Sequence, residues 1–442
     1  MPGFLQRSVT DVLVRPASEN DKKAPRRRKS LPLAEQLPIE ARRRRDEVPA
    51  HNKEKLPDRY KAQQAIGKGS YGCVWEAFDQ EESRLVAVKR VSNLFRDAVD
   101  CKRILREISL MSKLSHPGIV RLYDMPPVAD VGSFDEMFII MELCDADMQK
   151  LVRTNVTLSP GHVTTLLYNL LVGLKYLHSA GIYHRDLKPA NCLVNKDCSV
   201  KICDFGLSRA VGERHPAHLS VDEDGQPRLK RALTNHVATR WYRAPELILL
   251  QEDYTEAVDV WSVGCIYAEL LAMLEGGKLE DRCPLFPGSS CFPLSPDKAH
   301  ATDYLFHTRE NHDQLNVIFN YLGTPTEEDF AFLQREDAKR YLDCFRPRQG
   351  HGLQERFFHA GPDAIDVLED ALWFNPQKRS TVNGLLDHPI FDGVRNPDRE
   401  IEAPGPICLD FETGPDLDEL RLRANFMKVM ASFRTSGRTG GA

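Results

Sequence analysis

The sequence predicts an α+β protein in which a small β-rich lobe precedes a larger α-helical lobe. Short strand-like runs separated by turns dominate residues 60–141. Beyond them, apolar residues recur at helical spacing over much longer stretches. Hydrophobic residues make up 42% of the 442 residues and charged residues 28%, which is typical of a globular protein and excludes a collagen-like or wholly disordered chain.

The first 58 residues differ from the rest of the chain in their charge. They carry a net charge of +5, whereas the remainder carries −10. Basic clusters such as Arg42 to Arg45, several prolines and few aromatic residues leave this segment little apolar surface to bury. We therefore expect residues 1–58 to be a basic, mobile leader. The overall net charge of −5 argues against a general nucleic-acid binder.

Local patterns predict the elements of the smaller lobe. Runs rich in β-branched and aromatic residues indicate strands at residues 65–66, 74–78, 85–88 and 137–141. Ile104, Ile108 and Met111 recur at helical spacing, so residues 101–114 are expected to form an amphipathic helix.

Longer apolar periodicities predict the helices of the second lobe. These helices are expected at residues 162–180, 256–274, 312–322 and 363–373. A polar loop containing glycine and proline interrupts the pattern at residues 212–230. The tail becomes acidic from about Asn396 and ends in a short amphipathic stretch at residues 417–433.

Several broad classes of protein are excluded by simple counts. The 11 cysteines are odd in number and form no CxxC pair, which argues against a disulfide framework and a zinc ribbon. No apolar run reaches the roughly 18 residues that a membrane span needs, and the start lacks a signal peptide. We therefore expect reduced thiols and a location in the cytoplasm, the nucleus or both.

A glycine-rich pattern opens the smaller lobe. Gly67, Gly69 and Gly72, followed by Val74, read GxGxxGxV. Glycines permit a tight turn and let backbone N–H groups approach phosphate oxygens closely. A dinucleotide-binding fold would begin a helix at the third glycine. Here a predicted strand follows instead and ends in Lys89, 17 residues after Gly72.

The predicted helix that follows supplies a partner for this lysine. Glu107 lies in the middle of that helix. A pair between Lys89 and Glu107 would bridge strand and helix and direct the ammonium group toward the α and β phosphates of a nucleotide. The alternative is a glutamate on a solvated helix face.

Three further motifs follow in order. An HRD motif ends at Asp186 and is followed by Asn191. A DFG motif begins at Asp204, 13 residues after Asn191, and an APE motif ends at Glu246. With the glycine loop and the strand lysine, these motifs make residues 60–391 resemble the eukaryotic protein-kinase superfamily.

The resemblance implies a two-lobed protein-kinase fold. The small lobe would span residues 59–143 and the large lobe residues 144–391. An insert typical of one kinase branch would lie at about 276–311, and residues 392–442 would form a C-terminal extension.

The resemblance also implies roles for the motif residues. Asp186 would orient the substrate hydroxyl and accept its proton, and Lys188 would neutralise charge on the transferring phosphoryl group. ATP would be the phosphoryl donor. Asn191 and Asp204 would hold Mg²⁺, because amide and carboxylate oxygens suit this hard cation.

The nucleotide pocket can be placed by the same resemblance. Met141 falls at the gatekeeper position, Glu142 and Cys144 would offer backbone groups to adenine, and Asp147 would face the ribose. The full set expected to contact ATP is Ile66, Gly67, Lys68, Gly69, Ser70, Gly72, Val74, Lys89, Met141, Glu142, Cys144, Asp147 and Asn191.

One branch of the superfamily is indicated by the segment before the APE glutamate. The run from Thr239 to Glu246 reads TRWYRAPE, which resembles MAP kinases and cyclin-dependent kinases. In that branch the loop shapes a pocket for a proline after the phosphorylated Ser or Thr. The helix around Arg106 and the run beginning at Pro284 resemble MAP kinases. Arg379 matches the residue that pairs with the APE glutamate.

The activation motif departs from the usual Thr-x-Tyr of MAP kinases. This chain has Thr234-Asn235-His236 and resembles the Thr-x-His MAP kinases of apicomplexan parasites, the MAP kinase 2 group. A phosphate on Thr234 would add about −1.5 to −2 charge. It could gather Arg106, Arg185 and Arg209. Either an upstream kinase or the chain itself could phosphorylate Thr234, or a second phosphosite could lie elsewhere.

The two ends of the chain suggest partner binding. An acidic patch for docking peptides is expected among Asp410, Glu412, Asp416, Asp418 and Glu419. The leader run from Arg26 to Leu33 is basic and then aliphatic, which resembles such a docking peptide. A nuclear-localisation signal and a merely solvated tail are alternatives for the leader.

The expected function is transfer of the ATP γ-phosphoryl to Ser or Thr followed by Pro in protein substrates. No nucleic-acid partner and no membrane span are expected. Two alternatives stay open: an ATP-binding pseudokinase or scaffold without turnover, and a docking protein whose activity is dispensable.

Overall fold

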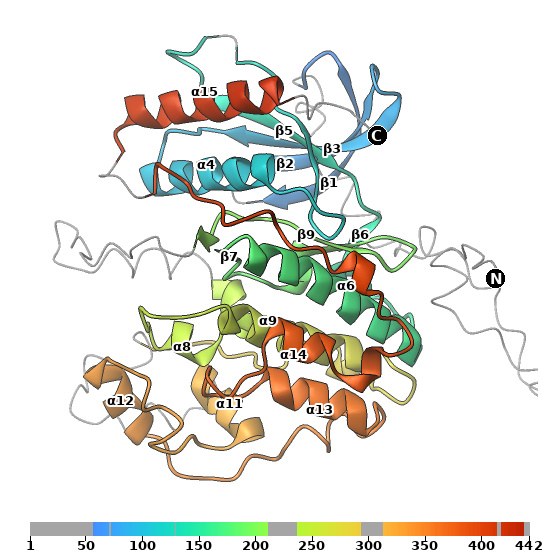
Figure 1. Ribbon diagram of the computed structural model, residues 1–442, viewed down its shortest axis with the longest axis vertical. Coiled ribbons are helices and arrows are strands. Elements are labelled where there is room, and N and C mark those ends of the chain that lie inside the picture. Colours follow the sequence, from blue (N-terminus) through green and yellow to red (C-terminus); the bar gives the residue numbers. More distant parts are fainter. Residues whose placement is uncertain are drawn as a thin grey trace, which may run out of the picture.

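The computed structural model describes residues 56–69, 72–128, 130–210, 237–292, 313–412 and 417–436. The leader up to residue 55, Ser70, and the segment containing Thr234 and His236 lie outside these ranges, so the predictions about them are not addressed by the structure. Figure 1 shows a sheet-containing lobe above a larger helical lobe.

The smaller lobe is built on one antiparallel sheet with the strand order β1-β2-β3-β5-β4. Alternating side chains from these strands, among them Trp75, Val86 and Ile140, form a buried cluster of their own. The strands are β1 (Tyr60–Gly69), β2 (Gly72–Asp79), β3 (Arg84–Ser92), β4 (Leu122–Asp124) and β5 (Glu136–Glu142).

Two helices lie side by side on this lobe (Figure 1). Helix α4 (Ala98–Lys113) begins at Asp97, whose side chain accepts hydrogen bonds from two backbone N–H groups of the first turn. Helix α15 (Glu419–Thr435) belongs to the C-terminal extension and packs against α4. Residues 419–435 therefore belong to the smaller lobe.

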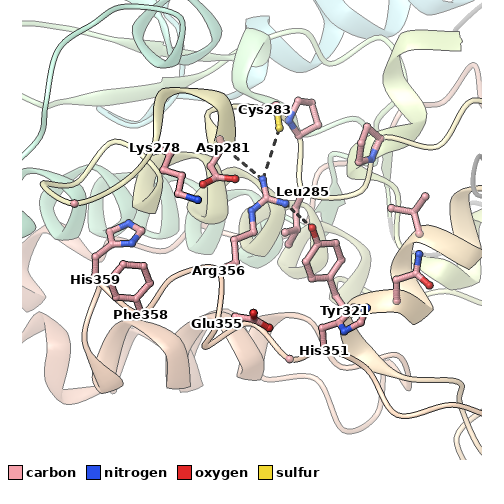
Figure 2. Close-up of a pocket in the computed structure, with 16 residues that line it drawn as sticks. Lys278, Asp281, Cys283, Leu285, Tyr321, His351, Glu355, Arg356, Phe358 and His359 are labelled. Carbon is pink, nitrogen blue, oxygen red and sulfur yellow. Dashed lines mark hydrogen bonds between the residues drawn. The ribbon is translucent and has the colours of Figure 1, made fainter.

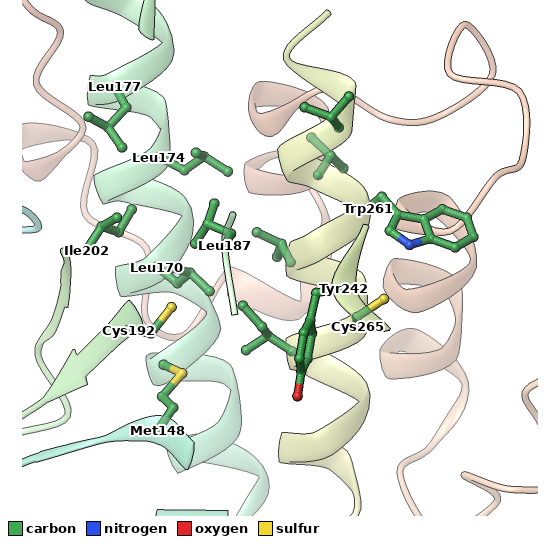
Figure 3. Close-up of a cluster of buried hydrophobic side chains, with 14 of the residues drawn as sticks. Met148, Leu170, Leu174, Leu177, Leu187, Cys192, Ile202, Tyr242, Trp261 and Cys265 are labelled. Atoms are coloured by element: carbon green, nitrogen blue, oxygen red, sulfur yellow. The ribbon is translucent and has the colours of Figure 1, made fainter. Parts of the chain in front are cut away.

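The larger lobe is helical and centres on α6 and α9. All 15 residues of α9 are buried, which explains its almost entirely apolar sequence. Figure 3 shows α6 beside α9, with Leu174 of α6 directed toward α9 and Trp261 on the opposite side of α9. The helices are α5 (Met148–Val152), α6 (Pro160–Ser179), α8 (Pro245–Ile248), α9 (Ala257–Leu271), α11 (Gln314–Leu322), α12 (Glu336–Asp343), α13 (Pro362–Ala371) and α14 (Val382–Leu386).

Short strands lie where the two lobes meet (Figure 1), and single 3₁₀ turns occur at intervals along the chain after Lys188. One sheet has the order β6-β8-β9 and a second pairs β10 with β7. These strands are β6 (Ala146–Asp147), β7 (Ile182–Tyr183), β8 (Cys192–Val194), β9 (Val200–Ile202) and β10 (Arg209–Ala210). The 3₁₀ turns are η2 (Pro189–Asn191), η3 (Val237–Tyr242), η4 (Leu279–Asp281), η6 (Pro389–Phe391) and η7 (Pro397–Arg399).

The predicted fold class is confirmed: a β-sheet lobe is joined to a helical lobe. Each helix and strand expected from periodicity is present, and only the ends differ. The strand expected at residues 65–66 runs over Tyr60–Gly69, because β2 pairs with it along its length. All 11 cysteines are free. Within the described ranges, no helix is long and apolar enough to cross a membrane.

Candidate active site

The glycine-rich segment forms the hairpin between β1 and β2. Gly69 pairs with Gly72 at its end, and Gly67 pairs with Val74. Gly72 has a φ of +154°, and a Cβ at this position would lie 1.8 Å from the carbonyl oxygen of Arg90. Only glycine therefore fits at residue 72 without moving the backbone of β3.

Lys89 and Glu107 meet between β3 and α4. The Lys89 Nζ lies 2.6 and 2.8 Å from the two carboxylate oxygens of Glu107. Burial opposes the charge on Lys89, but the carboxylates of Glu107 and Asp204 outweigh it and raise the pKa of the ammonium group. Burial also opposes the charge on Glu107 and raises its pKa, although the positive charge of Lys89 acts in the other direction. The two short contacts to one carboxylate support the ionised pair.

The catalytic loop holds Asp186, Lys188 and Asn191 together. The Lys188 Nζ lies 2.6 Å from Asp186 Oδ2, and Asn191 Nδ2 donates to the Asp186 backbone carbonyl at 2.9 Å. The buried Asp186 Oδ1 has no hydrogen-bond partner in the described part of the chain. A carboxylate oxygen with a free lone pair is what a group that accepts a proton from a substrate hydroxyl requires.

Asp204 stands beside this loop because of strand pairing. Cys192 of β8 pairs with Ile202 of β9, and Cys203 N–H donates to the Asn191 carbonyl at 3.0 Å. Asp204 follows with a left-handed φ of +68°. Such backbone strain in a non-glycine residue is often found at functional sites.

The chemistry of Asn191 and Asp204 fits a hard divalent cation. Burial would raise the pKa of Asp204, but the positive charges of Lys89 and Lys188 outweigh burial and lower it, so the carboxylate is ionised at neutral pH. Asn191 donates through Nδ2, which leaves its amide oxygen as a ligand atom. An oxygen-only pair of this kind suits Mg²⁺.

One residue that positions the loop was not singled out from the sequence. Asp259 of α9 is fully buried and accepts hydrogen bonds from the backbone N–H groups of His184 at 2.8 Å and Arg185 at 2.7 Å. His178 Nε2 lies 3.0 Å from the same carboxylate. Burial would raise the pKa of Asp259, but the bond with His178 and the neighbouring charges lower it. The available signal was an aspartate inside a largely apolar helix.

The residues expected around the nucleotide base lie on β5 and the segment that follows it. Met141 and Glu142 end β5. Cys144 follows two residues later, and burial raises the pKa of its thiol to about 12. Asp147 caps helix α5 and accepts a hydrogen bond from Lys150 N–H at 2.8 Å. Ile66 lies opposite on β1, where its carbonyl is 3.3 Å from Lys150 Nζ.

The structure corrects the prediction for Glu412. This residue was expected in a surface patch, but its side chain is only 5% exposed. It receives a 2.7 Å hydrogen bond from Arg106 Nε. Asp410, by contrast, is 88% exposed, and Asp418 caps helix α15. Asp416 lies outside the described residues.

The segment around the APE motif is fixed by buried polar contacts. Arg379 Nη1 lies 2.7 Å from Glu246 Oε1, as the sequence predicts, and both side chains are fully buried. Arg240 Nη2 donates to the Ser289 carbonyl at 2.9 Å, and Trp241 Nε1 donates to a neighbouring carbonyl at 2.8 Å. These contacts join the loop to the segment that begins at Pro284.

A separate pocket of about 740 Å³ lies in the larger lobe (Figure 2). Arg356 crosses it and donates to the Tyr321 hydroxyl at 2.9 Å and the Asp281 carbonyl at 3.2 Å. None of the residues expected to bind ATP or act in catalysis lines it. The pocket is therefore distinct from the candidate active site.

Comparison with known proteins places this geometry in a family. Residues 60–284 match the protein kinase domain. Mitogen-activated protein kinase 3 of Arabidopsis thaliana is 40% identical over 358 residues, which cover 81% of this chain and 84% of that relative. Mitogen-activated protein kinase 6 of the same plant is 40% identical over 347 residues, covering 78% and 76%. Mitogen-activated protein kinase 1 of Oryza sativa subsp. japonica is 39% identical with the same coverage.

The fold and the family match define a protein kinase. Within that class, the chain belongs to the mitogen-activated protein kinases. It is therefore a serine/threonine kinase that uses ATP and acts on proteins.

Proposed function

We propose that this kinase transfers the γ-phosphoryl of ATP to Ser or Thr residues that are followed by Pro. The proposal is carried by the ion pair between Lys89 and Glu107, taken with an Asp186 oxygen that has no hydrogen-bond partner among the described residues and can accept a proton. Together they supply the two requirements of the reaction, which are positioned phosphates and a group that orients the nucleophile.

In the proposed step, Asp186 accepts the proton of the substrate hydroxyl as that oxygen bonds to the γ-phosphorus. The bond from the γ-phosphorus to the bridging oxygen breaks, and ADP leaves. Lys188, held 2.6 Å from Asp186, neutralises charge on the moving group. Lys89 orients the α and β phosphates. Bound Mg²⁺, held by Asn191 and Asp204, would neutralise charge on the β and γ phosphates.

A peptide-library assay with Asp186→Asn tests this proposal. We expect kcat to fall by about 10²–10⁴-fold, because the proton acceptor is lost. Asp197→Asn is the matched control, since Asp197 is exposed in the turn between β8 and β9. Equal activity of the Asp186 variant and wild type would contradict the mechanism. Lack of turnover by wild type would favour the pseudokinase or scaffold alternative.

We also propose Thr234 as the activating phosphosite, modified by an upstream kinase or by the chain itself. Arg185 Nε and Arg209 Nη1 make no hydrogen bond within the described residues. Burial, and then nearby charges including those of Arg209 and Arg243, lower the pKa of Arg185, which marks a cluster of positive charge suited to a phosphate. Thr234→Ala should lower turnover of a protein substrate at least tenfold. Undiminished turnover would point to a phosphosite elsewhere.

The Thr-x-His motif, which resembles that of the MAP kinase 2 group, suggests a single phosphorylation, because His236 stands where a phosphorylated tyrosine would be. Arg240 and Arg243 would receive a phosphotyrosine in other MAP kinases. Here Arg240 is 5% exposed and bonded to the Ser289 carbonyl, which supports the proposal. Phosphosite mapping of active protein should find phosphate on Thr234 and none on another residue between 230 and 240.

Protein partners are proposed to include docking peptides that bind exposed acidic residues of the extension, such as Asp410 and Asp418. The basic leader would compete for the same residues, so deletion of residues 1–58 should tighten the binding of a basic docking peptide. Unchanged affinity would remove this role for the leader. A location in the cytoplasm or nucleus accords with these partners and can be checked by imaging a tagged chain.

A further inference from the structure

Glu412 is a buried carboxylate in the C-terminal extension surrounded by cations. Arg106 contacts one of its oxygens through both Nε and Nη2. The other oxygen, Glu412 Oε2, lies 3.4 Å from Lys102 Nζ and 3.8 Å from Arg209 Nη1. Because the side chains of Glu412 and Arg106 are only 5% and 4% exposed, solvent screens their interaction little.

Arg106 joins three parts of the kinase. Its Nη1 donates to the carbonyl of Gly206, the last residue of the DFG motif. Its backbone belongs to α4, where the next residue is Glu107, the partner of Lys89. The nitrogens of Arg106 are thus engaged by Glu412 and Gly206, and a phosphate on Thr234 would have to displace Glu412 to bind them.

The extension is fixed to the smaller lobe on both sides of Glu412. On the N-terminal side, the Cys408 carbonyl accepts a hydrogen bond from Lys113 of α4 at 2.7 Å. On the C-terminal side, Arg423 of α15 donates to the Phe134 carbonyl at 2.6 Å and lies 3.9 Å from the ring centre of Phe95. Phe426 completes an aromatic cluster with these rings. Glu412 is therefore held in place against α4.

We propose that Glu412 is a positioning residue that takes the place of a phosphate on Arg106. It holds α4 so that Glu107 reaches Lys89 whether or not Thr234 is phosphorylated. A Thr234 phosphate then binds Arg185 and Arg209 and acts on the protein-substrate side of the site. This inference deepens the proposed function and rests on it.

The inference separates two effects that a single phosphate would otherwise combine. Loss of Glu412 should weaken nucleotide binding, because Lys89 loses its oriented partner. Loss of the Thr234 phosphate should lower turnover of the protein substrate and leave the KM for ATP within about twofold. If Glu412 only stabilised the fold, its loss would not affect nucleotide binding separately from turnover of the protein substrate.

The test measures binding of a non-hydrolysable ATP analogue with Mg²⁺ to the full chain carrying Thr234→Ala. In this background Glu412→Gln should weaken binding at least tenfold, and Glu412→Asp should restore part of the affinity because it keeps the charge. Glu402→Gln, at an exposed residue earlier in the same extension, is the matched control and should have no effect. Thermal unfolding identifies any variant that fails to fold.

Two outcomes would overturn the proposal. One is an affinity change of less than twofold in folded Glu412→Gln protein. The other is tighter binding or higher activity, which would make Glu412 inhibitory. If Glu412→Gln does not fold, the Glu412→Asp variant decides, since unchanged affinity with a shortened side chain contradicts the geometry. Nucleotide binding requires no peptide turnover, so failure of the proposed substrate specificity would be seen separately.

Discussion

The carboxylate of Asp259 accepts a 2.7 Å hydrogen bond from the backbone N–H of Arg185, whose φ of +66° is left-handed. A non-glycine residue is disfavoured in this conformation. The two hydrogen bonds that Asp259 accepts, from the N–H groups of Arg185 and His184, compensate for that cost. Helix α9 thereby fixes the backbone that carries Asp186 one residue later.

Asp259→Ala should therefore destabilise the fold and slow catalysis. Two buried N–H groups would lose their acceptor, which corresponds to at least about 2 kcal/mol. We expect kcat to fall more than the KM for ATP rises, because the catalytic loop is disturbed and the pair of Lys89 with Glu107 is not. Denaturant unfolding and steady-state kinetics measure the two effects. Asp366→Asn, exposed on α13, is the control and should change neither.

The buried contact between Tyr242 and Glu269 predicts a pH dependence of stability. The Tyr242 hydroxyl donates to Glu269, and burial raises the pKa of that carboxyl from 4.5 to about 7. The folded state thus binds a proton more tightly than the unfolded state. The stability that this proton binding gives the folded state is fully present below pH 4.5 and is lost as the pH rises through 7.

Between pH 6 and pH 8, wild type should lose about 1.4 kcal/mol of stability relative to Glu269→Gln. Urea unfolding of both proteins at each pH measures the difference. Parallel stability curves for the two proteins would show that Glu269 does not titrate in this range. Glu275→Gln, in the turn after α9, serves as the control for removal of a carboxylate.

The main elements of the fold could be predicted because each has a period. In α4, α6 and α9 apolar residues recur over stretches long enough for a helix to be recognised from the sequence alone. Strands β6, β8 and β9 have only two or three residues and display no period. Their existence depends on pairing with one another, which a linear pattern does not reveal.

The candidate site divides in the same way. Lys89, Asp186 and Asp204 lie in motifs whose residue types and spacing indicate their chemical roles, so these residues could be predicted from the sequence. Glu412 lies 306 residues from Arg106 in the chain, so no local pattern connects them. A single glutamate in an acidic tail looks solvent-exposed until the tail is folded back onto α4. That is why the sequence placed Glu412 in a docking patch.

The buried pair of Glu246 and Arg379 predicts a large loss of stability when one partner is removed. Glu246→Ala would leave Arg379 charged and buried, which costs about 3–5 kcal/mol. Chemical unfolding measures this loss. The control is Asp329→Ala at the exposed contact with Lys378, where solvent screening should make the change much smaller. Similar losses in both variants would contradict the assignment of the buried pair.

Gly72 and Gly67 offer a matched pair of substitutions in the glycine-rich hairpin. In Gly72→Ala the new Cβ would lie 1.8 Å from the Arg90 carbonyl oxygen, so β2 and β3 must separate locally. In Gly67→Ala the Cβ would meet only the Val74 Cβ at 3.9 Å, an ordinary contact. Gly72→Ala should therefore lower the melting temperature clearly, while Gly67→Ala should preserve it. If Gly67→Ala nevertheless weakens binding of an ATP analogue, Gly67 is needed for close approach to the nucleotide and not for folding.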